Sequence, residues 1–368
     1  MTTRIRIRAI DWLRGLVILL MTIDHSGATL DAAHMHGDDG RSWVVGAALP
    51  AGEFLTRWIT HLCAPTFVML AGTSLALSAE KRRGQPGQTR FMVTRGLLIA
   101  ALDPLWMSLA FAHYRWIVFQ VIYAIGMSMV CMAWLRRLST RALLGGAIVI
   151  QATGELAARW TPQSEPLHGI LCFLLVGGRI GGRFVCAYPL IPWLSFMMLG
   201  WVLGRYLLEP AAREEKARTL ALLGVGLLGL FAVLRGIDGY GNWWLHRDSS
   251  APLQWLHVAK YPPSLTFTGL ELGISLLLLA LFLALDDPAR PRRAFGVLSL
   301  LGGTALFYYL LHAHILAAAE AIFDWNTHED GLAKTWIGAA LTVLVLLWPC
   351  AAYRRYKLAH PDGWTRYL

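Results

Sequence analysis

The sequence consists largely of apolar runs separated by short polar segments, and this feature limits the fold more than any other. A run of about 20 apolar residues crosses a hydrocarbon core of ~30 Å as an α-helix, because only internal hydrogen bonding satisfies the backbone there. Hydrophobic residues make up 56% of the 368 residues and charged residues only 15%, against about 25% charged in soluble domains. We therefore expect an all-α, polytopic integral membrane bundle forming a single domain over residues 1–368.

The apolar runs predict about ten transmembrane helices. Their expected ranges are 8–30, 54–79, 91–112, 116–135, 143–158, 188–208, 220–236, 265–285, 298–319 and 336–352. The stretch 167–176 is too short to span a membrane, so we expect a re-entrant or surface helix there. We expect a flexible turn in the glycine-rich sequence GGRIGGRF that follows, and the topology of residues 160–187 stays open.

Basic residues set the expected orientation. Arg4, Arg6 and Arg8 precede the first run, and the loops EKRRGQPGQTR and DDPARPRRAF and the tail YRRYKLAH are also basic. By the positive-inside rule both termini are cytoplasmic, with Arg179 and Arg183 as the exception. This distribution accounts for the net charge of +10, and no platform of alternating basic and aromatic residues indicates a nucleic-acid partner. The first run lacks a cleavage signature and is expected to be a retained helix.

The first run carries four ionisable residues: Asp11, Arg14, Asp24 and His25. Asp or Arg near the centre of a spanning helix costs roughly 2.5–3.5 kcal/mol on insertion scales, so such residues usually face a protein or water interior. Eleven residues separate Arg14 from His25, which places both on one helix face about 16 Å apart. We expect a polar shaft between them. In the alternative, Asp11 and Arg14 form an interfacial pair and His25 lies among the headgroups.

Other runs contribute further ionisable groups. Arg57 and His61 are spaced to be neighbours on the second helix, one turn before Pro65, which could kink it. His312 and His314 lie in the ninth run and could instead make ordinary interhelical hydrogen bonds.

A metal site is not expected. The loop 31–53 carries His34, His36, Asp38 and Asp39, which could bind a metal but more simply form a solvated loop. None of the five cysteines forms a C-x-x-C pair or a zinc spacing. Cys172 and Cys186 could approach each other.

Several stretches together resemble a known family. The segment IDWLRGLVILLMTIDH resembles the opening helix of the heparan-alpha-glucosaminide N-acetyltransferase family and its bacterial relatives. The stretches RWITHLCAPTFVMLAGTS, YPLIPWLSFMMLGWVLGR, KYPPSL and ALFYYLLHAHI resemble the remaining landmarks of the bacterial branch, so the resemblance runs from Ile10 to about His314. The opening helix is also similar to the Arg-x10-His pattern of bacterial membrane O-acyltransferases, here Arg14 to His25.

The resemblance implies a transmembrane acyltransferase in a bacterial inner membrane. Acetyl-CoA or another acyl-CoA would donate an acyl group on the cytoplasmic side, and a sugar or amino sugar would accept it on the far side. Nothing implies heparan itself as the acceptor. The family places its active histidine in the loop after the first helix or at the start of the second, where this sequence departs from the pattern. His61 is the best match, with His34 and His36 behind it.

Candidate roles follow from the residue types. His25, with its neighbour Asp24, is a candidate general base, and His61 and His312 could converge on the same chamber. Adjacent helix residues point about 100° apart, so Asp24 is not expected to orient the His25 ring directly. A histidine could take the acyl group covalently or assist direct transfer.

Arg14 and Arg95 lie near the cytoplasmic side and suit the phosphates of the donor. Each could instead be an ordinary inner-leaflet anchor.

Two other classes of protein remain open. Buried His, Arg and Asp also form proton or substrate relays in transporters, but no internal repeat supports that class. A non-catalytic membrane scaffold would leave the intramembrane charges unexplained. The partners expected are the lipid bilayer, an acyl-CoA and a carbohydrate acceptor. The oligomeric state is left open, with a homodimer as one option.

Overall fold

The structure is a computed structural model, and it describes most of the chain. The described residues are 7–31, 34, 37–40, 42–82, 84–159, 167–287, 293–323, 331–361 and 363–367. The expectations for Arg4, Arg6 and His36 fall outside these ranges.

The described chain is overwhelmingly helical, which confirms the predicted all-α class. Within it, eight helical segments are long and apolar enough to cross a membrane: α1 (Arg8–Leu30), α2 and α3 (Ala51–Thr60 and Cys63–Lys81), α4 to α5 (Gln88–Leu102 and Ser108–Ala112), α9 (Leu190–Leu208), α10 (Arg213–Ile237), α12 (Leu265–Leu285), α14 (Ala305–Phe323) and α15 (Gly331–Ala359). The other α-helices are α6 (Val121–Leu135), α7 (Thr140–Arg159), α8 (Leu167–Leu171), α11 (Pro252–Leu256) and α13 (Gly296–Gly303). The chain is thus a multi-pass membrane protein.

The two expected spans not among these eight correspond to α6 and α7. The expected span 116–135 is wrong at its start, because Ile117–Phe119 forms a strand and α6 has only 15 residues. α7 has 20 residues, but Gln151, Glu155 and Arg159 make its second half polar.

Three spanning segments are interrupted. A turn at His61 and Leu62 separates α2 from α3, and Pro65 follows in the first turn of α3, where a missing N–H is tolerated. Asp103–Met107 forms a π-helical turn, η1, which contains Pro104. The expected single helix 298–319 is wrong, because it is broken at Thr304 between α13 and α14.

A small three-stranded sheet replaces the flexible turn expected in the glycine-rich segment. Its strands are β1 (Ile117–Phe119), β2 (Gly178–Ile180) and β3 (Phe184–Cys186), in the order β1-β3-β2. Gly181 and Gly182 have positive φ and make the tight turn between β2 and β3. The preceding short helix (167–176) ends in the π-helical turn η2 (Cys172–Val176). Cys172 and Cys186 are both buried and do not form a disulfide bond with each other.

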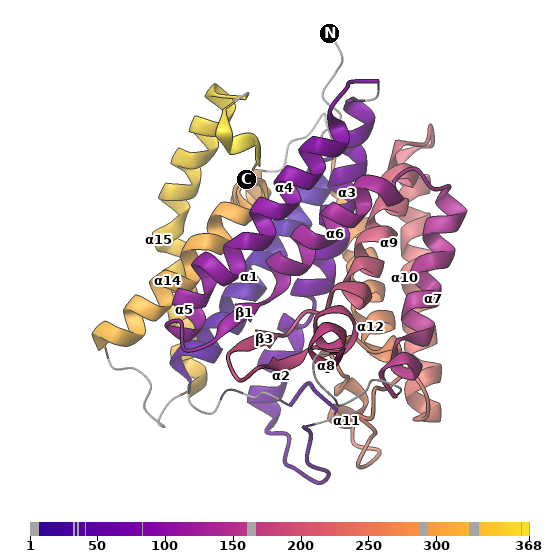
Figure 1. Cartoon of the computed structure of the whole chain (residues 1–368), viewed down its shortest axis with the longest axis vertical. Coiled ribbons are helices and arrows are strands. Elements are labelled where there is room, and N and C mark those ends of the chain that lie inside the picture. Colours follow the sequence, from indigo (N-terminus) through magenta and orange to yellow (C-terminus); the bar gives the residue numbers. More distant parts are fainter. Residues whose placement is uncertain are drawn as a thin grey trace.

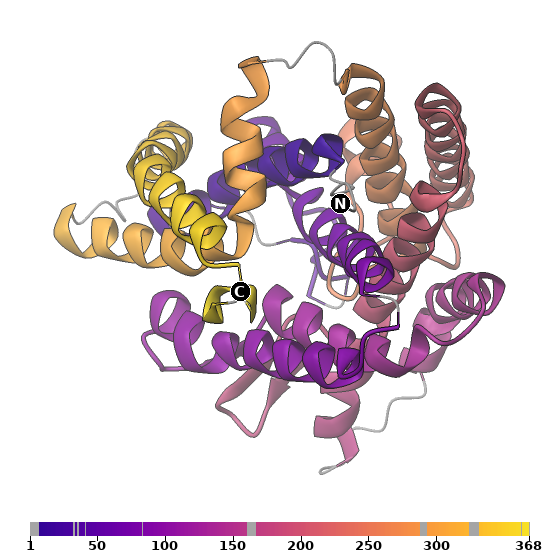
Figure 2. The ribbon, with the colours of Figure 1, turned by 90° about the horizontal axis from the view of Figure 1, so that it is seen from above.

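Glycines allow the central helices to approach closely. A β-carbon at Gly15 of α1 would collide with the main chain of Leu298 in α13. One at Gly200 of α9 would collide with the main chain of Met69 in α3. Small residues at such contacts are typical of membrane helix packing. Figures 1 and 2 show α14 and α15 on the side of the bundle opposite α7 and α10.

The two ends of the bundle differ in character. Arg8 and Arg213 both bind Asp286 at the end of α12, and Lys81 and Lys357 each line a cavity with Arg14. We call this region, where α1 begins and α15 ends, the basic end. The opposite end, where α2 and α11 lie in Figure 1, carries the loops 37–50 and 238–264 and is called the loop end. Main-chain bonds from Lys260 to Asp38 (2.9 Å) hold these two loops together.

Candidate functional site

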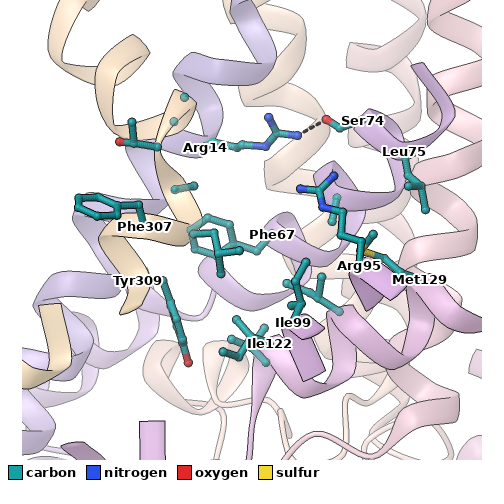
Figure 3. A pocket seen from close by; sticks show the side chains of 18 of the residues that line it. Arg14, Phe67, Ser74, Leu75, Arg95, Ile99, Ile122, Met129, Phe307 and Tyr309 are labelled. Atoms are coloured by element: carbon teal, nitrogen blue, oxygen red, sulfur yellow. Dashed lines mark hydrogen bonds between the residues drawn. The ribbon is translucent and has the colours of Figure 1, made fainter. Parts of the chain in front are cut away.

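A cavity of about 260 Å³ enters the bundle from the basic end. Arg14 of α1, Arg95 of α4 and Lys357 of α15 line it, so three helices contribute a cation. Arg14 donates to the Leu70 carbonyl at 2.9 Å and to the Ser74 hydroxyl of α3, the bond drawn in Figure 3. The predicted donor residues Arg14 and Arg95 therefore share one cavity.

The rest of this cavity is mainly apolar and ends at a tyrosine. Phe67, Ile99 and Ile122 line its walls. Tyr309 of α14 lies at the end away from Arg14 and points its hydroxyl away from the arginines (Figure 3). That hydroxyl is buried and has no hydrogen-bond partner among the described residues.

A second cavity of about 190 Å³ adjoins the first at the basic end and shares Arg14 and Ser74 with it. Asp11 and Lys81 also line it, and Asp11 lies 3.6 Å from Arg14. The interfacial Asp11–Arg14 pair considered from the sequence therefore exists, but Arg14 also lines both cavities.

Two histidines lie beyond Tyr309. The centroid of the Tyr309 ring is 6.3 Å from that of His25 and 5.3 Å from that of His312. His25 Nδ1 and His312 Nε2 are 2.6 Å apart, which joins α1 to α14. The structure thus brings the predicted residues His25 and His312 together, while His314 bonds the Leu310 carbonyl and stacks on Trp106 instead.

The hydrogen bonds assign the protons of this pair when both rings are neutral. His312 Nδ1 lies 2.7 Å from the Tyr309 carbonyl, which can only accept, so His312 carries its proton on Nδ1. His312 Nε2 then accepts from His25 Nδ1–H. The remaining nitrogen, His25 Nε2, keeps its lone pair and makes no hydrogen bond to a described residue. A histidine held in this way is prepared to act as a base through Nε2.

Asp24 belongs to a separate charged cluster. The buried Arg57 donates to Asp24 and, from Nε at 2.8 Å, to Asp38 of the loop. Thr60 donates to Asp24 at 2.8 Å. His61 lies 3.1 Å from the second Asp38 oxygen. We call Asp24, Asp38, Arg57 and His61 the charge cluster; it joins α1, α2 and the loop end.

The contacts of the charge cluster can be compared with what the sequence predicted for Asp24, His34 and Asp38. Asp24 and His25 turn to different partners, as their angular separation predicts. Burial raises the pKa of Asp38, but Arg57 and His61 outweigh it and hold that pKa well below the usual range. His34 lies 3.9 Å from Asp24, at the edge of the cluster. Among the described residues no group of His, Cys, Asp or Glu is arranged to hold a metal ion.

Sequence reasoning missed two buried ionisable residues beside the charge cluster. Lys260 is 2% exposed, and Glu271 of α12 is 1% exposed. Lys260 stands in the KYPPSL stretch that carried part of the family resemblance. Glu271 is the acidic residue of an otherwise apolar run, a pattern that marks a functional candidate. The position of Lys260 in KYPPSL and the isolated acidic Glu271 could both have indicated these residues from the sequence.

A third cavity, of about 590 Å³, opens at the loop end. Asp39, Arg159, Arg179 and Trp244 are among its lining residues, and Asp39 directly follows Asp38 of the charge cluster. Trp244 has a φ of 63°, which is unusual for a bulky residue and is found mainly where the surroundings fix the backbone.

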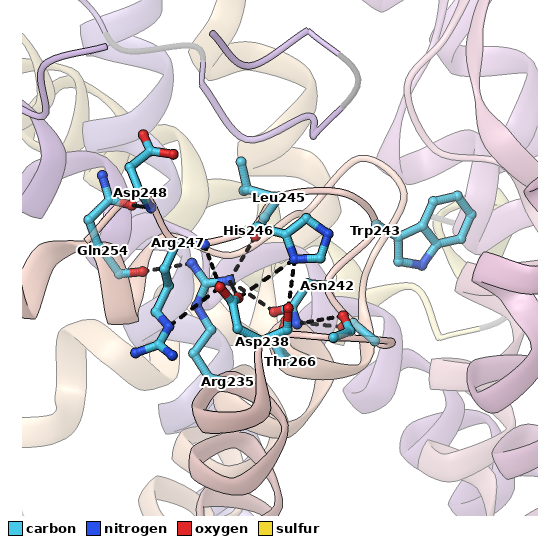
Figure 4. A network of polar contacts seen from close by, with 12 residues as sticks. Arg235, Asp238, Asn242, Trp243, Leu245, His246, Arg247, Asp248, Gln254 and Thr266 are labelled. Atoms are coloured by element: carbon cyan, nitrogen blue, oxygen red, sulfur yellow. Dashed lines mark hydrogen bonds and ion pairs between the residues drawn. The ribbon is translucent and has the colours of Figure 1, made fainter. Parts of the chain in front are cut away.

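Two buried side chains fix that backbone. Glu155 accepts from the main-chain N–H of Gly241 at 2.8 Å and of Trp243 at 3.0 Å. Arg235 of α10 is fully buried and donates to Asn242 and to three carbonyls of the loop, at 2.6–2.9 Å (Figure 4). The loop 238–257 is therefore rigidly tied to α10.

The fold defines a multi-pass membrane protein with ionisable side chains buried among its helices. The model of one family, the catalytic region of heparan-alpha-glucosaminide N-acetyltransferase, matches residues 6–231. The chain belongs to this family, which confirms the resemblance found in the sequence. The matched part contains Arg14, His25, His61 and Arg95, whereas His312 lies beyond it. A comparison with individual characterised proteins gave no match.

Proposed function

We propose that the protein transfers an acyl group, in the simplest case acetyl, from acyl-CoA bound at the basic end to an acceptor at the loop end. One observation carries this proposal. The cavity with three cations ends at Tyr309, and the ring of Tyr309 contacts the His25–His312 pair on its other side. A donor held by its phosphates near Arg14 would point its thioester toward a base.

The cavity at the basic end fits the chemistry of an acyl-CoA. Cationic side chains bind phosphate oxygens through charge-assisted hydrogen bonds, and the guanidinium groups of Arg14 and Arg95 can do so with two donors each. The apolar walls between the cations and Tyr309 suit the uncharged pantetheine arm. Arg14 and His25 are separated by a helical rise of about 16 Å, so the arm would bridge the phosphate and histidine sites.

The transfer step uses the free nitrogen of His25. His25 Nε2 takes the proton from an acceptor hydroxyl or amine as the acceptor atom forms a bond to the acyl carbon. The carbon–sulfur bond then breaks, and the thiolate leaves and takes up that proton. His312 holds the His25 ring through Nδ1. Trapping an acyl group on His25 in a single turnover would instead favour a covalent route.

The charge cluster would hold the site together, and the loop-end cavity would admit the acceptor. Arg57 joins α1, α2 and the loop through Asp24 and Asp38. His61, which lies beside Asp38, would be a second acyl-handling candidate. The loop-end cavity, with Trp244 and Arg159, would admit a sugar or amino-sugar acceptor. By the positive-inside rule the basic end faces the cytoplasm, so a bacterial inner membrane would place the acceptor outside the cell.

The test is acyl transfer by the purified protein. Acetyl-CoA is supplied with a panel of amino sugars and glycans, and release of CoA and acetylated product are both measured. We expect turnover with at least one acceptor, and we expect His25→Ala to lose it while still binding CoA. A wild-type protein that neither binds CoA nor releases it from acetyl-CoA would refute the proposal.

A transporter is the second candidate, because a cavity lies at each end of the bundle and Tyr309 lies between the basic-end cavity and the histidines. Such an arrangement also suits alternating access. Ion-coupled uptake of a sugar into vesicles, unaffected by acetyl-CoA, would favour this function over acyl transfer.

A further inference from the structure

The position of Lys260 is fixed by its main chain. Lys260 lies in the loop between α11 and α12, and its N–H donates to the Asp38 carbonyl at 2.9 Å. The N–H of Tyr261 donates to the same oxygen at 3.3 Å. Because Arg57 holds the Asp38 carboxylate, the backbone at Lys260 is tied directly to the charge cluster.

The ammonium of Lys260 is buried but unused. It lies 5.2 Å from the centre of the Tyr261 ring. Among the residues that the structure describes, it makes neither a hydrogen bond nor an ion pair. A contact with a ring face leaves the three N–H donors of an ammonium without hydrogen bonds, which is costly for a buried group.

A second buried cation in this protein, Arg235, has a structural role, and its N–H groups do have acceptors. Arg235, in the helix that precedes the same loop, is also fully buried, yet it donates to Asn242 and to the carbonyls of Leu245, Gln254 and His257. The contrast with Lys260 indicates that the Lys260 ammonium is kept available for a group that arrives from outside.

The contacts around Lys260 indicate the kind of group. Its main chain is bonded to Asp38, and Arg57 binds both Asp38 and Asp24, the residue that precedes His25 in α1. Tyr261, over whose ring the ammonium lies, has its hydroxyl 3.3 Å from that of Tyr188. The Lys260 ammonium therefore belongs to the same buried polar region as the proposed base, where it would stabilise an anion that forms during transfer.

We propose that Lys260 stabilises the oxyanion that forms on the acyl carbonyl during transfer. This role rests on the proposed acyltransferase function. As the acceptor atom bonds to the acyl carbon, the π-electron pair of C=O moves to oxygen, where the ammonium stabilises it. The pair returns to re-form C=O when the carbon–sulfur bond breaks, and the acceptor proton moves to His25 Nε2. Atoms and electrons balance without a further reactant.

A simpler role for Lys260 is that of a counter-charge. Asp24 and Asp38 carry two negative charges against the single positive charge of Arg57, and Lys260 would bring this sum to zero. A counter-charge, however, is expected to pair directly with a carboxylate. The two roles also differ in their kinetics, because a counter-charge affects folding and positioning whereas an oxyanion-binding group affects kcat.

The test compares Lys260→Met, Lys260→Arg and Arg247→Met in acetyl-CoA turnover. Arg247→Met is the matched control, since Arg247 lies in the same loop with its guanidinium 4.3 Å from the centre of the Trp255 ring, outside the charge cluster. We expect Lys260→Met to lower kcat about 10²–10³-fold, as loss of an oxyanion-binding group does, with the KM for acetyl-CoA and CoA binding nearly unchanged. Lys260→Arg should recover part of that loss, and Arg247→Met should retain wild-type kcat.

The outcomes separate the two proposals. If the wild-type protein neither binds nor turns over acetyl-CoA, the acyltransferase function fails and the role of Lys260 fails with it. If the wild type is active and a folded Lys260→Met retains its kcat, only the role of Lys260 is overturned. If Lys260→Met does not fold, Lys260→Arg decides: bound CoA with partly retained kcat supports the role, and kcat at the level of the uncatalysed reaction overturns it.

Discussion

Removing Arg57 should destabilise the protein strongly, because this one guanidinium balances two buried carboxylates. Arg57 is 7% exposed and donates to both Asp24 and Asp38. Arg57→Leu would leave both carboxylates buried without the guanidinium that binds them. Breaking a buried pair in this way costs about 3–5 kcal/mol, or a factor of about 10² to 10⁴ in the folding equilibrium at 1.4 kcal/mol per tenfold.

The assay is reversible unfolding of the purified protein in detergent, followed by tryptophan fluorescence. Arg159→Leu is the matched control: the Arg159 side chain is 51% exposed and pairs with Glu155 at 3.1 Å. Glu155 keeps its bonds from the N–H groups of Gly241 and Trp243 when Arg159 is removed, so the loss should cost only about 1 kcal/mol. The triple variant with leucine at Arg57, Asp24 and Asp38 should regain stability relative to Arg57→Leu, because it no longer buries the two carboxylates that Arg57 had bound. A cost below 1 kcal/mol for Arg57→Leu would refute the cluster as a structural tie.

Three further predictions concern the donor site, the base and the effect of pH. Arg95→Met removes one of the three cations in the basic-end cavity, so the KM for acetyl-CoA should rise about tenfold with kcat little changed; a lower kcat at constant KM would exclude Arg95 from the donor site. His312→Gln removes the imidazole that accepts from His25 Nδ1, so turnover should fall about 10²–10⁴-fold, and unaltered turnover would show that His312 does not orient the base. Burial lowers the pKa of His257, so the unfolded chain binds the proton first. Stability should therefore fall as pH drops below about 6.5, and less steeply in His257→Gln, as unfolding measured at pH 5 and pH 7.5 would show.

Much of the fold follows from the sequence because hydropathy and the length of apolar runs govern membrane helices. The same signals do not report where a long helix breaks. The break at Thr304 directly follows Gly302 and Gly303, a local signal that hydropathy alone passes over because the run stays apolar. The strand at Ile117–Phe119 instead depends on a partner, Phe184–Cys186, that is distant in the sequence. The strand is a tertiary feature, so local patterns could not predict it.

The candidate site was predicted in part for a similar reason. Helical spacing within one segment predicted that Arg14 and His25 share one face and that Asp24 and His25 point apart, and the structure gives Asp24 and His25 different partners. A polar shaft was expected between Arg14 and His25, whereas the cavity that Arg14 lines has mainly apolar walls. The spacing within one helix does not show which other helix packs against it. The pairing of His25 with His312 could therefore be named from the sequence only as a possibility. Asp38 was considered for a metal, because sequence alone does not show that Arg57 binds its carboxylate.

Some buried polar side chains of this protein make hydrogen bonds with every donor or acceptor that matters for their position, whereas others have a donor or acceptor without a partner. Arg57 and Arg235 donate hydrogen bonds to protein oxygens, and each joins a loop to a helix. His25 Nε2, the Lys260 ammonium and the Tyr309 hydroxyl have no such partner among the described residues. A polar group left unsatisfied in a membrane protein interior is costly unless a substrate completes it. Because one group is a base, one a cation and one a neutral donor, a reacting acyl group and its acceptor could satisfy all three at once.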